Sequence, residues 1–108
     1  MKPVLIISTY PDKNSLGKIA DQLVRSKIAA CVNISKTSSI YMWRGKVESS
    51  SEYIGLFKTT QKNKKILKEK IRATHPYEVP EIAEIDVTSV NKPYYDWLVE
   101  STSGVSSA

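Results

Sequence analysis

The feature that most constrains the fold is a continuous run of large apolar residues, VLII, at residues 4–7. A strand with one face in water alternates apolar and polar side chains, whereas a strand covered on both faces can be apolar throughout. Pro3 heads the run, a position that proline tolerates in a strand. The run therefore predicts a buried central strand over residues 4–8, and the other elements must flank and cover it.

Two stretches have apolar residues at helical spacing. Residues 10–15 (YPDKNS) form a loop with N-cap side chains, and after it one apolar stripe consists of Leu16, Ile19, Ala20, Leu23, Val24 and Ile28. The second stretch, residues 61–73, has apolar side chains on one side and mostly lysines on the other. Because Pro76 disfavours helical backbone at the residue before it, this helix is predicted to end at about Thr74.

Strand patterns occupy the region between these helices. Residues 29–35 alternate, with Ala30, Val32 and Ile34 pointing one way. A break rich in Ser and Thr follows. Residues 40–43 and 52–60 then predict a hairpin that turns at Arg44-Gly45.

Further signals complete the pattern. Gly55, in the middle of the returning strand, indicates a bulge or a close approach of the backbone. Residues 82–87 predict a last strand, with alternate apolar residues on one face. Asn91-Lys92-Pro93 opens a terminal helix that has one apolar side, made of Tyr94, Trp97 and Leu98.

The predicted element order is βαββαβ followed by a helix. This order is typical of an α+β, ferredoxin-like fold with a four-stranded antiparallel sheet. Right-handed crossovers place the first two helices on one face of that sheet. The other face must be solvated, covered by the terminal helix or buried against another copy, and we expect it to carry Cys31, Asn33, Tyr53 and Phe57 or their neighbours.

Length and composition bound the class of protein. The chain has 108 residues, which fits one small domain with one core. We predict this domain over residues 1–101, with a flexible tail over 102–108 because these residues are small and polar. No apolar run approaches the ~20 residues of a membrane span. The lone Cys31 allows no internal disulfide and suits a reducing compartment, so we predict a cytoplasmic protein.

Charge and the long hairpin bear on partners. The net charge is +5, yet only three of the 16 Lys and Arg residues are Arg. Proteins that read nucleic-acid sequence favour Arg, because its planar group contacts bases bidentately. We therefore predict a solvated basic face, with neither nucleic acid nor membrane as a partner. The hairpin over residues 40–52 is long for a small domain and favours pairing with another copy.

The stretch THPYEVPEI, residues 74–82, holds the only His of the chain. His75 either follows a helix C-terminus, where positive charge is favoured, or acts as a ligand or acid/base group. With one thiol, Cys31, the ligands are too few for a structural zinc site, whereas Cu(I) needs fewer. No P-loop, GxSxG or HExxH motif is present, so we predict no catalysis and no catalytic residue.

Several short motifs follow one another along nearly the whole chain. They are ACVNI (30–34), Tyr41 and Trp43 before Gly45, EY (52–53), KT (58–59), HPYEVPEI (75–82) and YYDWL (94–98). In this order they resemble the CutA divalent-ion-tolerance family over about residues 3–100. The resemblance implies a very stable homotrimer that associates through sheet edges and long hairpins, and a fold similar to the nitrogen-regulatory signalling proteins. It also implies tolerance of copper and other divalent metals, without an established enzymatic activity.

The resemblance carries a metal role to two residues. His75 matches the His of the family's HPY motif, and Cys31 lies at a position that the family shares. Thr74 stands where some members have a second His, and Ser8 where some have a Cys. The resemblance therefore implies His75 and Cys31 as the residues that contact copper or another divalent metal ion.

Two further functions stay open beside the metal function. A signalling-type sensor would bind a small anionic ligand in a cleft between subunits, and the candidate cleft residues are Tyr53, Lys58, Tyr77, Glu78, Glu81 and Trp97. Glu78 and Glu81 would equally supply oxygen donors to a metal. Alternatively, the trimer is a stable scaffold whose HPYEVP segment seals the assembly.

Overall fold

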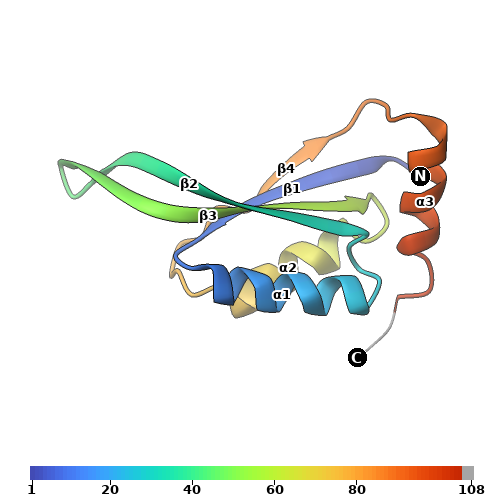
Figure 1. Ribbon diagram of the computed structural model, residues 1–108, viewed down its shortest axis with the longest axis horizontal. Helices are drawn as coiled ribbons and strands as arrows, with labels where there is room; N and C mark the ends of the chain where they lie inside the picture. Colours follow the sequence, from blue (N-terminus) through green and yellow to red (C-terminus); the bar gives the residue numbers. More distant parts are fainter. Residues whose placement is uncertain (106–108) are drawn as a thin grey trace.

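The computed structural model describes residues 1–105, which form one sheet and three helices (Figure 1). The elements in chain order are β1 (Pro3–Tyr10), α1 (Lys13–Arg25), β2 (Cys31–Trp43), β3 (Lys46–Thr60), α2 (Lys64–Thr74), β4 (Ala83–Asp86) and α3 (Lys92–Ser101). The sheet order is β2-β3-β1-β4, with every neighbouring pair antiparallel. The predicted α+β, ferredoxin-like fold with an additional C-terminal helix is confirmed.

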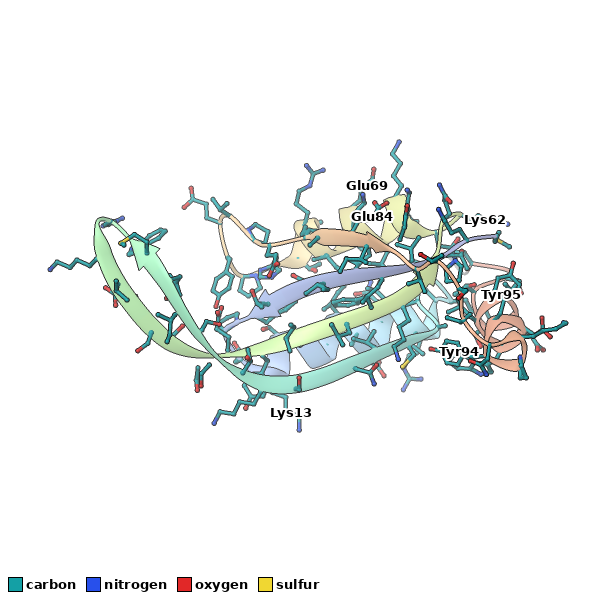
Figure 2. All side chains as sticks on the ribbon, turned by 90° about the horizontal axis from the view of Figure 1, so that it is seen from above. Lys13, Lys62, Glu69, Glu84, Tyr94 and Tyr95 are labelled. Atoms are coloured by element: carbon teal, nitrogen blue, oxygen red, sulfur yellow. The ribbon has the colours of Figure 1, made fainter. Side chains whose placement is uncertain are left out.

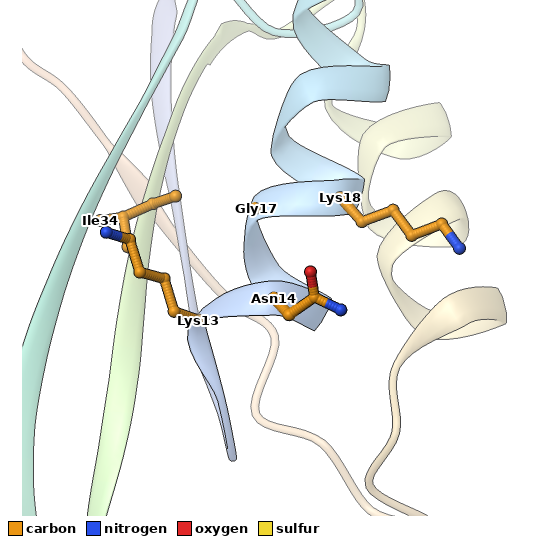
Figure 3. A pocket seen from close by; sticks show the side chains of 5 residues that line it. All are labelled: Lys13, Asn14, Gly17, Lys18 and Ile34. Carbon is orange, nitrogen blue, oxygen red and sulfur yellow. The ribbon is translucent and has the colours of Figure 1, made fainter.

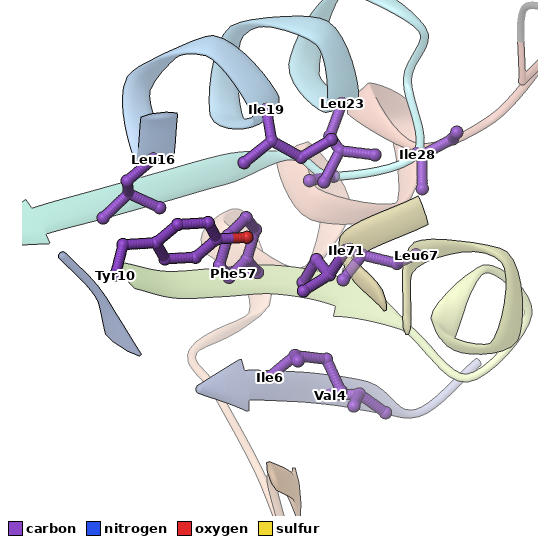
Figure 4. Close-up of a cluster of buried hydrophobic side chains, with 11 residues drawn as sticks. Val4, Ile6, Tyr10, Leu16, Ile19, Leu23, Ile28, Phe57, Leu67 and Ile71 are labelled. Atoms are coloured by element: carbon purple, nitrogen blue, oxygen red, sulfur yellow. The ribbon is translucent and has the colours of Figure 1, made fainter. Parts of the chain in front are cut away.

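The apolar run forms the central part of this sheet. Strand β1 pairs with β3 on one side and with β4 on the other. Helices α1 and α2 lie along one face of the sheet, and α3 lies at the end away from the hairpin tip (Figure 1). The core between sheet and helices is made of Val4, Ile6, Tyr10, Leu16, Ile19, Leu23, Ile28, Ala29, Phe57, Leu67 and Ile71 (Figure 4).

The strand register decides which side chains face the helices. Ile6 pairs with Phe57, and residues directly opposite share a face, so Phe57 lies in the core and is fully buried. Tyr53 pairs with Tyr10 and packs against the same core. The prediction that Phe57 and Tyr53 lie on the open face is therefore wrong. Since both alternate sets of side chains in residues 53–57 contain apolar residues, alternation alone does not fix the phase.

The open face carries the other alternate set. Cys31 pairs with Lys58, and Lys58 pairs with Leu5, so these three side chains share that face. Its other members include Ile7, Asn33, Ile54, Leu56, Ala83 and Ile85. The placement of Cys31 and Asn33 there is as predicted.

The β2–β3 hairpin extends well beyond the rest of the chain (Figure 1). Pairing continues without a break from Cys31↔Lys58 to Trp43↔Lys46, so the predicted interruption in the Ser- and Thr-rich part is wrong. Serines on the two strands face one another there, and hydroxyl side chains are compatible with a solvated ribbon. The turn is at Arg44-Gly45 as predicted, and both residues have positive φ, 49° and 78°, as a type I′ turn requires.

Polar contacts set the boundaries of the helices. Asp12 caps α1, because its Oδ1 accepts a hydrogen bond from the Ser15 amide at 2.7 Å. The helix ends at Arg25, so Ile28 packs in the core from the turn that follows and not from the predicted helix. The buried Asn63, just before α2, donates from Nδ2 to the carbonyl oxygen of Thr102, just after α3, at 3.0 Å.

Thr102 itself is only 3% exposed. Its hydroxyl donates to the carbonyl oxygen of Leu98 at 2.8 Å, which adds to the bond from Asn63. The first residue of the predicted tail is therefore buried and hydrogen-bonded against α3 and Asn63. Residues 106–108 of the predicted tail lie outside the described part of the chain.

Two salt bridges join the short edge strand β4 to α2. The carboxylate of Glu84 (labelled in Figure 2) accepts from Lys64 Nζ at 2.8 Å and from Lys68 Nζ at 2.6 Å. These two lysines lower the pKa of the Glu84 carboxyl. The arrangement uses two of the α2 lysines within the fold, so the basic face of this helix is less available to a partner than the sequence alone indicates.

Gly55 is a close-approach position and not a bulge, because the pairing of β3 with both neighbours keeps one register throughout. A Cβ at residue 55 would stand 2.8 Å from Cδ1 of Leu16 and 2.8 Å from Cε1 of Phe57. Both of those side chains are fully buried in the core. Glycine at this position therefore lets α1 approach the sheet.

Gly55→Ala is expected to destabilise the fold by about 1–3 kcal/mol, because the added methyl group overpacks the core against Leu16 and Phe57. Gly17→Ala, within α1, is the matched control. A Cβ there meets nothing within 4 Å, so helix propensity should stabilise that variant by up to about 1 kcal/mol. Urea unfolding of both variants measures the difference, and equal stability of the two would contradict the assignment.

Candidate functional site

The candidate site is the segment that follows α2, at the end of β1 and the base of the hairpin. The structure ends α2 at Thr74, as predicted, and His75 takes extended backbone angles. The next four residues, 76–79, form bends. The bend brings the backbone amide of Tyr77 within hydrogen-bonding distance of the His75 ring.

His75 has both ring nitrogens engaged. Its Nε2 lies 2.9 Å from the carbonyl oxygen of Thr9, and its Nδ1 accepts the backbone N–H of Tyr77 at 3.1 Å. A carbonyl only accepts and an amide N–H only donates, so this pair of partners assigns a neutral ring with the proton on Nε2. The ring also stacks on Tyr10, with centroids 4.0 Å apart, and lies 5.2 Å from the ring of Tyr77.

The electrostatics agree with a neutral ring. Burial lowers the pKa of His75, and the hydrogen bond to Thr9 only partly opposes this effect. Position after a helix C-terminus favours a positive charge, but desolvation outweighs it here. Burial also raises the pKa of Tyr10, beneath the imidazole, to about 12, so this phenol stays neutral as well. His75 therefore joins the helix end to the central strand as an uncharged, half-buried group.

Tyr77 extends the same cluster to the hairpin. Its hydroxyl donates to Oε2 of Glu52, on β3, at 2.6 Å. Burial first, and then this carboxylate, raise the pKa of Tyr77 above its usual value. Beyond Tyr77, Glu78 and Glu81 are exposed, and Val79 is 88% exposed. The bend thus presents the Glu78 carboxylate and the Val79 side chain outward, and Glu81 lies exposed just after it.

The structure does not bring His75 and Cys31 together. His75 contacts Thr9, which pairs with Ile54, whereas Cys31 pairs with Lys58. Four residues of strand separate these pairs, or about 13 Å. The imidazole also stacks on the helix-facing Tyr10, while Cys31 lies on the open face. Within residues 1–105, no three His, Cys, Asp or Glu side chains gather as a group that could hold a metal.

The six candidate cleft residues separate into two places within the chain. Tyr53, Tyr77, Glu78 and Glu81 belong to the hairpin base or the bend. Lys58 lies five residues along β3 from Tyr53, about 17 Å away. Its ammonium lies 5.8 Å from the ring centroid of Tyr94 on α3, and the Tyr94 ring lies 5.5 Å from that of Trp97. Lys58 and Trp97 therefore belong to the α3 end of the sheet.

Sequence reasoning missed three groups that build the His75 cluster. They are the Thr9 carbonyl, the Tyr10 ring and the Glu52 carboxylate. One signal was available for Tyr10, which continues the buried alternation Val4, Ile6, Ser8 of the central strand. Nothing in the sequence indicates that Glu52 and Tyr77 meet, since 25 positions separate them.

An open groove of about 710 Å³ lies between the start of α1 and β2 (Figure 3). Its lining residues are Lys13, Asn14, Gly17, Lys18 and Ile34. Lys13 extends toward Ile34, whereas Lys18 extends away from β2, so the two ammonium groups do not converge (Figure 3). No helix in residues 1–105 has both the length and the apolar character needed to cross a membrane.

Residues 4–101 match a protein family described as CutA1 divalent ion tolerance protein. The chain belongs to the CutA1 family. The divalent-cation tolerance protein CutA of Pyrococcus horikoshii is 37% identical over 99 residues, which cover 92% of this chain and 97% of the relative. The protein of the same name from Thermus thermophilus is 43% identical over 103 residues, or 94% of this chain and 99% of the relative.

A solved structure agrees with this assignment. The crystal structure of divalent ion tolerance protein CutA1 from Ehrlichia chaffeensis matches with a TM-score of 0.90 at 32% identity, and covers 95% of this chain and 98% of that one. The family that the motifs predict is thus confirmed, and the CutA1 fold is shared along almost the whole length.

His75→Phe should remove the two hydrogen bonds of the imidazole while keeping a ring against Tyr10. Leaving the Tyr77 amide and the Thr9 carbonyl without their partner is expected to cost about 1–3 kcal/mol at pH 7.5. Because the folded pKa of His75 is lowered, the unfolded chain takes up a proton below about 6.5 that the native state does not. Wild-type stability contributed by His75 is therefore lost as the pH falls.

Urea unfolding at one fixed protein concentration, at pH 7.5 and pH 5.5, measures this effect. The stability gap between wild type and His75→Phe should narrow at pH 5.5, since the variant lacks the only imidazole in the chain. A gap that stays constant or widens would mean that His75 is not held neutral.

Proposed function

We propose that this protein acts in tolerance of divalent cations, copper among them, as a cytoplasmic homotrimer that binds or responds to the metal without catalysis. The match of residues 4–101 to the CutA1 family supports the tolerance function. The names of the relatives from Pyrococcus horikoshii and Thermus thermophilus support it as well. Copper, the trimer and the cytoplasm are the specific parts of the proposal.

The apolar surface of the hairpin is the observation that supports assembly into a trimer. Ile40, Met42, Trp43 and Val47 are 57–77% exposed on a ribbon that has no other element of the subunit beside it (Figure 1). The outer edge of β2 also presents backbone groups without a strand partner over the described residues. Exposed apolar patches and free strand edges mark association surfaces, and other copies of the chain would cover both.

For the metal, the geometry favours a responsive contact over a permanent one. In each subunit, His75 Nδ1 already accepts the Tyr77 amide and Nε2 faces the Thr9 carbonyl. A metal ion at Nδ1 must displace the Tyr77 amide, so binding there would be coupled to a change in the bend of residues 76–79. The exposed Glu78 in that bend, and the exposed Glu81 just after it, would supply oxygen donors.

Cys31 would contribute separately from His75. Its thiol is half-buried on the open face, the face that assembly would cover, so a soft ion there would be shared between subunits. The two proposed ligands therefore predict two classes of metal site per trimer, with different preferences. A thiolate favours Cu(I), and an imidazole with carboxylates favours Cu(II) or Zn(II).

Titration of the reduced protein with Cu(I), Cu(II) and Zn(II) tests this function. Saturable binding is expected with a defined number of ions per trimer. His75→Phe should weaken Cu(II) or Zn(II) at least tenfold, and Cys31→Ser should weaken Cu(I). Asn33→Ser, on the same face as Cys31, is the matched control and should bind as wild type does. Absence of saturable binding below high micromolar metal, or equal binding by all variants, would contradict the metal function.

A second candidate function, sensing of a small anionic ligand, is favoured by one observation. Lys58 forms no salt bridge with any described residue, although its side chain is half-buried beside α3. A half-buried cation without an ion-pair partner could take an anionic ligand as its counter-ion. The third hypothesis, a stable scaffold, is supported only by the same hairpin surface that supports the trimer.

A further inference from the structure

A small pocket lies between the open face of the sheet and α3, at the end of the molecule away from the hairpin tip. Its volume is about 230 Å³. The walls are mostly apolar and come from β1, from the segment after β4 and from α3, including Leu5, Val87, Val90 and Leu98. Tyr94, labelled in Figure 2 on α3, and Lys58 on β3 complete the lining.

The two polar side chains of this pocket are both left without a hydrogen-bonding counterpart. Lys58 forms no salt bridge within residues 1–105, and its ammonium lies 5.8 Å from the Tyr94 ring centroid. The hydroxyl of Tyr94 is buried and has no hydrogen-bond partner among the described residues. An ammonium only donates, whereas a phenol both donates and accepts, so a ligand with acceptor oxygens could pair with both side chains.

We propose that this pocket binds a short-chain monocarboxylate. The carboxylate would accept hydrogen bonds from the Lys58 ammonium and the Tyr94 hydroxyl, and the hydrocarbon chain would lie against Leu5, Val87, Val90 and Leu98. The pocket is half-open, so its volume indicates a short chain and does not fix an exact length. A water takes up about 30 Å³ in the liquid, so 230 Å³ holds roughly seven or eight such units, which fits butyrate or valerate.

The charge of the pocket selects a monoanion. One ammonium neutralises one negative charge, and apolar walls would leave the second charge of a phosphate or dicarboxylate uncompensated. The site is distinct from the His75 cluster, because Lys58 lies on the opposite face of the sheet from Tyr10 and His75. The proposal deepens the second candidate function, on which it rests, and does not depend on metal binding.

Isothermal titration of the full-length protein with acetate, butyrate and valerate tests the proposal, at constant ionic strength set with sodium chloride. Affinity should rise about fourfold for each added methylene as more of the chain is buried. Butyramide, which has the same shape without the charge, should not bind measurably. Lys58→Met keeps the length of the side chain and should weaken valerate at least tenfold. Tyr94→Phe should weaken it several-fold.

Lys65→Met, on the exposed side of α2, is the matched control and should bind valerate as wild type does. The proposal is overturned if valerate does not saturate the protein, as would happen if a carboxylate of a neighbouring copy filled the pocket. It is also overturned if the affinity does not change with the length of the carboxylate's chain, or if Lys58→Met binds valerate as tightly as wild type does.

Phosphate and citrate form a second arm of the experiment. Binding of these anions that depends on Lys58, without binding of monocarboxylates, would refute the ligand class and leave the sensing function standing. Binding of none of these anions would refute both. Thermal melting of each variant verifies that the substitutions leave the fold intact, and Lys58→Gln replaces Lys58→Met if that variant is unstable.

Discussion

The pairing of β1 with strands on both of its sides is the constraint on which the rest of the structure depends. It makes Val4–Ile7 the centre of the sheet and fixes β3 in a register that puts Phe57 opposite Ile6. That register sends Phe57 and Tyr10 toward α1 and α2, and leaves Leu5, Ile54 and Lys58 on the other face. Both regions with chemical interest, the His75 cluster and the Lys58 pocket, are consequences of this one alignment.

The two regions lie at opposite ends of the strands. At one end, Thr9 and Tyr10 hold the imidazole, and the Tyr77 hydroxyl reaches Glu52 on the hairpin. At the other end, α3 covers a limited part of the open face and leaves Lys58 among apolar side chains. Between them, the open face carries aliphatic residues that no helix of the subunit covers. A subunit built this way has a complete core on one face of its sheet only.

The sequence allowed the element order, the fold and the family to be predicted, because each rests on local signals. The VLII run, Pro76 and the Arg44-Gly45 turn each constrain a few neighbouring residues, and the structure agrees with all three. Which face of β3 turns toward the helices was not predictable, since both of its alternate sets of side chains contain apolar residues. The packing of Phe57 with core residues of β1, α1 and α2 distinguishes them, and those contacts span several elements.

The chemistry of His75 could not be predicted for the same reason. Its position after a helix indicates a charged ring, whereas its neutrality comes from Thr9, Tyr10 and a bend whose amide returns to Nδ1. The candidate cleft likewise combined residues from two distant places in the chain, since Lys58 and Trp97 lie at the α3 end and Tyr77 lies at the hairpin base. Lys58 and Tyr77 can share a site only across copies, so a shared cleft requires that the chain assembles.

Sedimentation equilibrium tests the proposed assembly most directly. At micromolar concentration, the wild-type protein is predicted to have three times the mass of one chain. Trp43→Ser, at the exposed hairpin tip, should shift the equilibrium toward smaller species. Val24→Ser should not, although Val24 is also an exposed apolar residue, because it lies on the helical layer. A monomeric wild type, or a loss of assembly in Val24→Ser equal to that in Trp43→Ser, would contradict the account.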